Sequence, residues 1–236
     1  MQVALITGGS KGLGLAFADS LVRDGWTVVI DGRDAVALAE AEAHLRACAA
    51  DGPGRVVAIA GDVADAAHRA ALVHELTALG RLDVLVNNAS TLGPSPQPSM
   101  AEYPLNDFRR VLEVNVVAPL SLLQATLPML RTANGIVIDV TSDAGVEGYS
   151  GWGGYGSSKA ALEQLSNVLA AEEPDVHVYW FDPGDMRTEM HQAAFPGEDI
   201  TDRPLPSTVV PALRRLIAES PPSGRFRAAE LLEPPT

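Results

Sequence analysis

The most informative stretch of this 236-residue chain for its fold is Thr7-Gly8-Gly9-Ser10-Lys11-Gly12-Leu13-Gly14. A short apolar run, Val3–Thr7, leads into it and is typical of a buried strand, and the helix-forming segment Leu15–Asp24 follows. Glycines between a strand and a helix let the backbone turn tightly and approach a pyrophosphate closely. The N-terminus of the helix presents free N–H groups and a positive dipole end to the anion. The sequence therefore predicts a dinucleotide-binding site near its N-terminus.

Strands and helices alternate along the rest of the chain. Short apolar runs bounded by Gly, Asp or Pro predict strands at Thr27–Asp31, Arg55–Ala60, Leu82–Asn87, Ile136–Thr141 and Val176–Phe181, with a possible short last strand within Ser223–Ala228. Helical spacing of apolar residues predicts helices at Ala35–Ala50, Ala66–Leu79 and Asn106–Leu130. The alternation predicts a single α/β domain, residues 1–236, of the Rossmann type: a doubly wound, mainly parallel sheet of six to seven strands with helices on both faces.

The composition narrows the class of protein. The chain carries 17 Lys and Arg against 30 Asp and Glu, a formal net charge of −13, which argues against nucleic acid or an anionic membrane as its partner. The single cysteine, Cys48, excludes an internal disulfide framework and fits a reducing compartment. The N-terminus lacks a basic n-region, and no run approaches the ~20 apolar residues of a spanning helix. We expect a cytoplasmic protein. The five histidines show no metal-ligand spacing with cysteine or carboxylates, so no metal site is predicted.

The order of several motifs resembles the short-chain dehydrogenases/reductases over about residues 3–190. The resemblance rests on the G-x-x-x-G-x-G spacing of the loop and on Tyr155-Gly156-Ser157-Ser158-Lys159, with further motifs between and after them: Asp62-Val63, Asn87-Asn88-Ala89, Asn115, Ser142 and Pro183-Gly184. It implies an oxidoreductase that interconverts a small carbonyl compound and an alcohol by hydride transfer with a nicotinamide dinucleotide. It also implies a homodimer or homotetramer, although the C-terminus lacks the family's glycine-rich ending.

The loop and the resemblance together give the expected cofactor contacts. These are Gly8, Ser10, Lys11, Gly12, Leu13, Gly14, Arg33, Asp62, Val63, Asn88, Ala89, Tyr155, Lys159, Pro183, Gly184 and Thr188. The family's ribose-binding acid usually occupies the position of Gly32 in this chain, and Arg33 follows with a planar cation suited to a 2′-phosphate. Together with Lys11, this pattern predicts NADP(H). Asp31 leaves NAD(H) open, because a small rotation of the strand end could bring its carboxylate to the ribose.

Tyr155 and Lys159 are candidate catalytic residues because they are four positions apart. On a helix this spacing puts them one turn apart on one face. An ammonium about 5 Å from a phenol is expected to lower the pKa of the phenol by about two units from its usual value near 10. Tyr155 would then serve as a general acid and base, as the resemblance also implies. The rival phenol, Tyr149, has Gly153 rather than a cation four positions later.

Ser142 and Asn115 complete the expected catalytic set. Ser142 ends the predicted fifth strand, where its hydroxyl could donate to a substrate oxygen; a turn-capping role is the alternative. Pro119 has no N–H for the carbonyl of Asn115, so we expect a kink in the helix there. The resemblance implies that the Asn115 carbonyl holds a water that links Lys159 to solvent. A plain asparagine inside a helix is the alternative.

Two proline-rich stretches, 93–98 and 184–206, follow strand ends where open α/β sheets bind ligands, and residues 185–206 form the predicted substrate loop. Candidate pocket walls are Leu92, Tyr149, Trp152, His191 and Phe195; the other histidines are expected to be solvated or in strands. Asp143 and Glu147 would favour a neutral or cationic substrate.

One departure from the family pattern concerns the predicted cofactor pocket. Ser90 replaces the glycine that commonly completes Asn-Asn-Ala-Gly, and its side chain is expected to crowd the ribose or narrow the pocket. Two other functions compete with the oxidoreductase. One is a non-catalytic dinucleotide-binding sensor or scaffold, and the other is a methyltransferase on a similar sheet.

Overall fold

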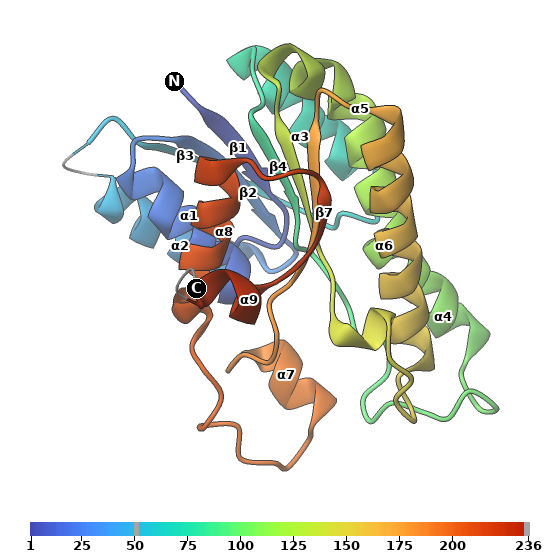
Figure 1. Ribbon diagram of the computed structural model, residues 1–236. Coiled ribbons are helices and arrows are strands. Elements are labelled where there is room, and N and C mark those ends of the chain that lie inside the picture. The colour runs from blue at the N-terminus through green and yellow to red at the C-terminus, as the bar shows by residue number, and fades with distance from the viewer. Residues whose placement is uncertain (50–51, 234–236) are drawn as a thin grey trace.

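Within the described part of the chain, seven parallel strands form one sheet in the order β3-β2-β1-β4-β5-β6-β7 (Figure 1). The computed structural model describes residues 1–49 and 52–233. The strands are β1 (Val3–Ile6), β2 (Thr27–Gly32), β3 (Arg55–Ala60), β4 (Val84–Asn87), β5 (Ile136–Val140), β6 (His177–Asp182) and β7 (Gly224–Arg227). The strand order reverses between β1 and β4, and an open α/β sheet binds its ligand at the carboxyl ends of the strands at such a point.

Helices cover both faces of the sheet (Figure 1). On one face lie α1 (Gly12–Arg23), α2 (Ala35–Cys48), α8 (Val210–Glu219) and α9 (Ala228–Leu232). On the other lie α3 (Ala66–Leu79), α4 (Leu105–Leu112), α5 (Ala118–Ala133) and α6 (Gly153–Glu172). The short helix α7 (Glu189–Ala194) projects beyond the carboxyl ends of the strands. The predicted doubly wound fold is confirmed.

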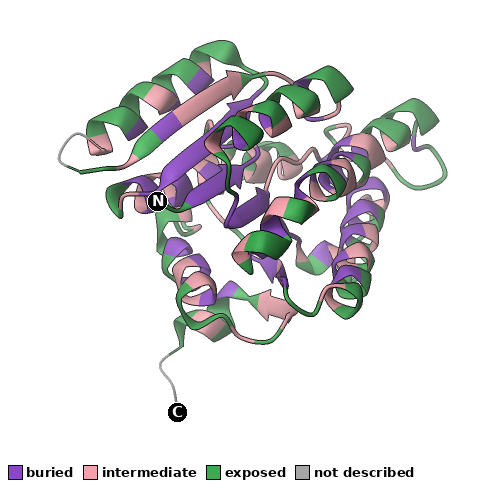
Figure 2. Ribbon diagram, turned by 90° about the horizontal axis from the view of Figure 1, so that it is seen from above, coloured by how far each residue is buried: buried purple, intermediate pink, exposed green. Residues whose placement is uncertain are grey.

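The apolar core is split into two layers by the sheet, and the strands β1, β2, β4 and β5 are buried between them (Figure 2). Phe17, Leu21 and Leu213 are fully or almost fully buried on the α1 face. Leu72 and Leu122 are buried to the same extent on the α3 face. Burying a residue of this size stabilises the fold by roughly 1.5–3 kcal/mol. Both layers hold the strands rigidly, so the loops at their carboxyl ends have fixed anchors.

The ends of elements differ slightly from the predicted ones. The first helix begins at Gly12 rather than Leu15, so the last glycines of the loop belong to its first turn. The predicted last residue of the second helix, Ala50, lies outside the described residues.

The predicted helix Asn106–Leu130 is interrupted near Asn115, as expected. A π-helical segment, Glu113–Val117, separates α4 from α5 immediately before Pro119. By length and composition the continuous segment Leu105–Ala133 could cross a membrane. In the fold, Leu122 and Leu130 of this segment are buried against the sheet, so its apolar residues serve the core.

Candidate functional site

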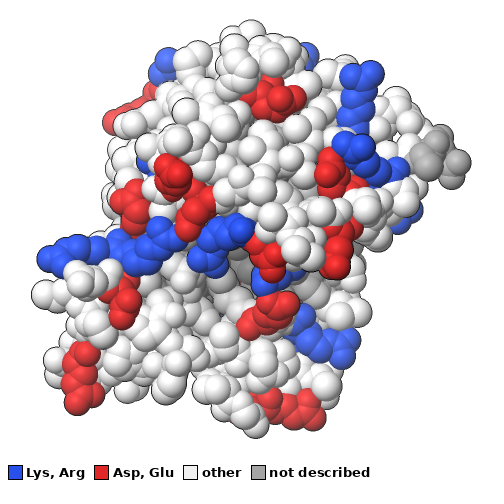
Figure 3. Space-filling model, turned by 180° about the vertical axis from the view of Figure 1, so that it is seen from behind, with Lys and Arg blue, Asp and Glu red and all other residues white. Residues whose placement is uncertain are grey.

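A cavity of about 1340 Å³ opens at the carboxyl ends of the strands. The loop between β1 and α1 lines one part of it, and residues from the β5–α6 and β6–α7 connections line another. Ordinary ligand pockets measure roughly 300–1,000 Å³, so this one has room for a dinucleotide together with a small substrate. Figure 3 shows a face of the molecule on which basic side chains gather along a hollow, with acidic side chains beside them.

The loop before α1 forms a cradle that only glycine permits. Gly8 and Gly12 have φ values of +65° and +59°, which side-chain-bearing residues rarely adopt. A Cβ on Gly14 would lie 2.6 Å from the carbonyl oxygen of Gly8. No side chain caps the helix, since Lys11 at its N-cap is extended and makes no capping bond. The first N–H groups of α1 are therefore available to an anion, and the cradle fits a pyrophosphate.

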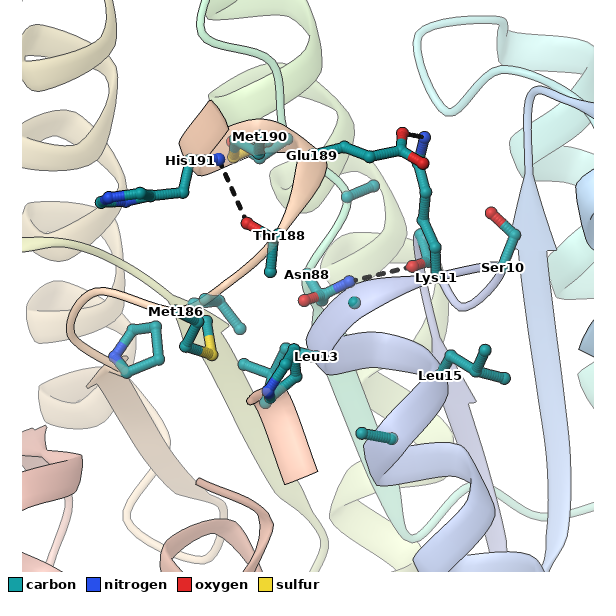
Figure 4. A pocket seen from close by; sticks show the side chains of 18 of the residues that line it. Ser10, Lys11, Leu13, Leu15, Asn88, Met186, Thr188, Glu189, Met190 and His191 are labelled. Carbon is teal, nitrogen blue, oxygen red and sulfur yellow. Dashed lines mark hydrogen bonds and ion pairs between the residues drawn. The ribbon is translucent and has the colours of Figure 1, made fainter. Parts of the chain in front are cut away.

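Thr7 and Asn88 fix the shape of this loop. The Oγ1 atom of Thr7 accepts hydrogen bonds from the N–H groups of Asn88 and Ala89, each at 3.0 Å. The Nδ2 atom of Asn88 donates to the carbonyl oxygens of Thr7 at 2.9 Å and Gly8 at 3.1 Å. In Figure 4 the Asn88 side chain points toward the start of α1. This role of Thr7 was not predicted, because nothing in the sequence shows which loop its hydroxyl meets.

The Asp31 carboxylate is turned into the protein rather than toward a ribose. It accepts from the Gly8 N–H at 2.6 Å and lies 2.9 Å from Nε2 of His68. Asp31 is 1% exposed and His68 is 7% exposed. The expectation that His68 is solvated or in a strand is wrong, because α3 turns it onto this carboxylate. Both carboxylate oxygens of Asp31 are thus bound within the protein. The argument for NAD(H), which needed this carboxylate at the ribose, loses its support.

Basic side chains reach the outer part of the cavity. Arg33 is exposed at the end of β2 and lines the cavity. Lys11 lines it too and forms an ion pair with Glu189 of α7, across the mouth (Figure 4). Burial alone would raise the pKa of Asp62, but the Ala64 N–H, the Arg110 guanidinium and the nearby Arg33 lower it. Arg33 thus stands where its charge acts on the cavity.

The other predicted cofactor residues also lie around the cavity. Ser10, Leu13, Val63 and Ala89 line it beside the glycine loop. Pro183, Gly184 and Thr188 line the part that follows β6. Asp182, to which the sequence analysis gave no role, accepts from the Gly184 N–H at 3.0 Å and so shapes this turn.

Tyr155 and Lys159 are buried together in the cavity wall, on one face of α6. They are 7% and 2% exposed, and Nζ of Lys159 lies 5.4 Å from the centre of the Tyr155 ring. Nζ donates to the carbonyl oxygen of Val140 at 2.7 Å. Burial lowers the pKa of Lys159 to about 8, although Asp139 and Glu163 oppose the shift.

The prediction that Lys159 lowers the pKa of Tyr155 is wrong for the chain alone. Burial raises this pKa above the usual value, and Asp182 and Asp143 raise it further, while the hydroxyls of Ser142 and Ser90 lower it only in part. Desolvation of the phenolate in the buried wall is the largest contribution, and it outweighs the two hydrogen bonds that lower the pKa. At neutral pH Tyr155 is therefore protonated.

Ser142 caps a short turn at the end of β5. Its Oγ atom donates to Oδ1 of Asp143 at 2.9 Å and accepts from the Ala144 N–H at 3.2 Å. It also lines the cavity and faces the Tyr155 phenol closely enough to lower its pKa. Ser142 can therefore cap the turn through its Oγ lone pair and also present its Oγ–H to the cavity, so the two expectations do not exclude each other.

Asn115 is buried and holds the loop after β4. Its Nδ2 atom donates to the Thr91 carbonyl and to Oγ of Ser158, both at 2.9 Å. Its Oδ1 atom accepts from the Thr91 N–H at 2.9 Å and from Oγ of Ser90 at 3.2 Å. Ser90, the residue that departs from the family pattern, therefore links Asn115 to the surroundings of Tyr155.

Arg225 on β7 contacts three residues around the site, and this role was not predicted from the sequence. Its guanidinium donates to the backbone carbonyl of Ser142 at 3.3 Å and to Oδ2 of Asp182 at 3.2 Å. It also donates to Glu163 of α6, at 3.1 Å for the nearer oxygen. Arg225 thus ties the strand ends that carry Ser142 and Asp182 to the helix that carries Tyr155.

Aromatic side chains form the wall opposite the glycine loop. Trp152 packs against Tyr155 with ring centres 5.8 Å apart, and against Phe195 at 5.8 Å. His191 stacks on Phe195 at 4.8 Å. The His191 side chain is 10% exposed and lines the cavity, while Leu92 is buried beside Tyr155. Leu92, Trp152 and His191 therefore lie where the sequence analysis placed pocket walls.

A glycine cradle at the reversal point of a parallel sheet, with a buried tyrosine and lysine beside it, defines a dinucleotide-binding α/β protein. A family profile described as short chain dehydrogenase matches residues 2–199. The chain belongs to the short-chain dehydrogenase family, whose members are oxidoreductases.

Individual relatives agree with this assignment. The chain is 37% identical over 184 residues to a rhamnolipid-biosynthesis 3-oxoacyl-[acyl-carrier-protein] reductase of Pseudomonas aeruginosa, covering 75% of this chain and 69% of the relative. It is 33% identical over 199 residues to a benzil reductase ((S)-benzoin forming) of Saccharomyces cerevisiae, covering 81% and 74%. A short chain dehydrogenase structure from Shigella flexneri complexed with NADP superposes with a TM-score of 0.88 at 29% identity, covering 97% of each chain.

Proposed function

We propose that this protein is an NADP(H)-dependent oxidoreductase that interconverts a ketone or aldehyde and an alcohol. The observation that carries the proposal is the buried pair of Tyr155 and Lys159 in the wall of a cavity that begins at a glycine cradle. The cradle can hold a pyrophosphate, and the pair lies where a proton can meet a substrate oxygen. A sensor or scaffold would need only the cradle.

Different residues of the cavity would bind different parts of the cofactor. The N–H groups of α1 would hold the pyrophosphate, and Arg33 with Lys11 would hold the 2′-phosphate. Asp62, Val63, Asn88 and Ala89 would line the adenosine, Tyr155 and Lys159 would meet the nicotinamide ribose, and Pro183, Gly184 and Thr188 would face the carboxamide. When bound, the cofactor supplies or accepts the hydride.

Tyr155 supplies the proton for reduction. Because its pKa is raised, its phenol keeps the proton at neutral pH and can give it to the carbonyl oxygen as negative charge develops there. Ser142 can turn its Oγ–H from Asp143 to the same oxygen and orient it. Asp143 and Asp185 line the cavity, and their negative charge supports a neutral or cationic substrate, whereas Glu147, which was expected to add to this charge, is not among the lining residues.

The two directions of the reaction should respond differently to pH. Alcohol oxidation needs a phenolate at Tyr155, and a raised pKa confines that form to alkaline solution. We expect kcat/KM for oxidation to rise about tenfold per pH unit between pH 7 and 9 where this step limits the rate, whereas reduction stays level. Steady-state rates across this range measure both; a rise in reduction and a fall in oxidation would contradict the assignment.

Arg33 should set the choice of cofactor. Replacing Arg33 by alanine removes a charge-assisted contact of about 1.5–3 kcal/mol, so we expect kcat/KM for NADPH to fall about 10- to 100-fold. The value for NADH should change less than threefold. Arg46→Ala is the matched control, since Arg46 is an exposed arginine on the same side of the sheet, paired with Glu42. A preference of the unmodified protein for NADH would refute the choice of NADP(H).

A panel of carbonyl compounds that vary in size and charge, followed by NADPH absorbance, tests the reaction itself. We also propose that the protein acts in the cytoplasm as a homodimer or homotetramer. The family resemblance supports the assembly, and light scattering measures it.

A further inference from the structure

Three side chains with metal-ligand atoms meet between α1 and α2, away from Tyr155. Asp19 projects from α1, and His44 and Cys48 project from one face of α2, four residues apart. Oδ1 of Asp19 lies 3.2 Å from Nε2 of His44 and 2.8 Å from Sγ of Cys48. Nε2 of His44 and Sγ of Cys48 are 3.8 Å apart. No metal site was predicted from the sequence, because the spacing of His44 and Cys48 does not show that a carboxylate from another helix meets them.

The spacing of these atoms matches a tetrahedral metal. A triangle with these three sides has a circumradius of about 1.9 Å, slightly less than the 2.0–2.3 Å bonds that zinc makes to oxygen, nitrogen and sulfur. An ion could therefore sit a little above the plane of the three atoms at bonding distance from all of them, with almost no movement of the side chains. The fourth position would point to solvent, because the large cavity reaches Asp19 and His44.

Arg23 is the group that this ion must displace. Its NH2 atom lies 2.9 Å from Sγ of Cys48 and 3.2 Å from Oδ1 of Asp19, while its Nε atom donates to Oδ2 of Asp19 at 2.8 Å. The Arg23 side chain is 56% exposed, so it can swing outward at little cost. Withdrawal of NH2 from Oδ1 of Asp19 and from Sγ of Cys48 would free both atoms for the ion, and the guanidinium could then contact Oδ2 as an outer partner of the ligating carboxylate.

We infer that Asp19, His44 and Cys48 form a binding site for a zinc-like divalent cation, with one position open to water. An imidazole, a thiolate and a carboxylate are the ligands that zinc takes in proteins. Two anionic ligands neutralise the ion, and the net charge of −13 favours cation approach. The site joins α1 to α2, so its occupation should stabilise the folded chain. None of its three ligands has a role in the proposed reaction.

Cobalt(II) is the probe that tests the site, because a thiolate–cobalt bond gives a charge-transfer absorption in the near ultraviolet. Cys48 is the only cysteine of the chain, so such a band in the untagged protein identifies its thiolate as a ligand. We expect the band to saturate at one cobalt per chain and to disappear when zinc is added in equal amount. Zinc should also raise the Tm of the protein. Absence of the band with cobalt in large excess would overturn the site.

Variants separate this site from unspecific binding. We expect Cys48→Ser to remove the band, and His44→Gln and Asp19→Asn each to weaken zinc binding by at least about tenfold, as the rise in Tm will report. The matched control is His74→Gln, an exposed histidine on α3, which should leave both readouts unchanged. Equal zinc affinity in His44→Gln and the control would also overturn the site.

Discussion

Replacing Tyr155 by phenylalanine is expected to lower kcat for carbonyl reduction by about 10²- to 10⁴-fold, the usual contribution of a positioned general acid. The substitution removes one hydroxyl and keeps the ring that packs at 5.8 Å against Trp152. The Kd for NADPH, measured by fluorescence titration, should change less than about threefold, since the cradle and Arg33 are untouched. A loss of kcat with intact cofactor binding is the signature of a missing proton donor.

Tyr149→Phe is the control for this variant. Tyr149 lies at the same end of α6 and also contacts Trp152, but its hydroxyl is exposed and donates to Asp143 at 3.0 Å. Asp143 and Glu147 hold the pKa of Tyr149 at about 12, so it too stays protonated at neutral pH. We expect kcat within about threefold of the unmodified enzyme. Unchanged turnover in Tyr155→Phe, or an equal loss in both variants, would refute Tyr155 as the proton donor.

The fold could be predicted from the sequence because its signals are local. Short apolar runs bounded by Gly, Asp or Pro gave the strands, and alternation with helices gave the parallel sheet. The interruption near Asn115 followed from Pro119, which removes one N–H. The start of the first helix was missed because Gly12 and Gly14 are poor helix formers. In the structure the turn after β1, and not helix propensity, sets the first residue of α1 at Gly12.

The candidate site could be predicted only where its parts are close in sequence. Tyr155 and Lys159 share one helix face, so their spacing predicted their proximity. The bond between Asp31 and His68 joins residues 37 positions apart, and the contact of Arg225 with Ser142 spans 83 positions. Such pairs depend on how the sheet brings strands together. The raised pKa of Tyr155 was missed for the same reason, because burial is a property of the packed wall.

Replacing Lys159 by methionine is expected to abolish most activity and yet stabilise the protein at pH 7. Under the proposed function Lys159 helps to orient the cofactor ribose and the phenol of Tyr155, so kcat/KM should fall by about a hundredfold or more. Methionine has a similar length and no charge, so burying it avoids the desolvation cost that lowers the pKa of Lys159. The lost hydrogen bond to Val140 costs about 1 kcal/mol, and Asp139 keeps its bonds from Ser166 and Asn87.

The stability difference should depend on pH in one direction. The pKa of Lys159 is about 8 in the folded chain and 10.5 when unperturbed, so between these values the unfolded chain binds more protons than the folded one. The free energy of unfolding of the native chain should therefore rise with pH over this window, by up to about 3 kcal/mol. The methionine variant lacks this rise, so its advantage at pH 7 should vanish or reverse near pH 10. Urea unfolding at both pH values measures this. Lys11→Met is the control, since it changes the chain's other lysine, which is 61% exposed. If the free energy of unfolding of Lys159→Met were lower than that of the native chain by the same amount at both pH values, burial of the Lys159 ammonium would carry no desolvation cost.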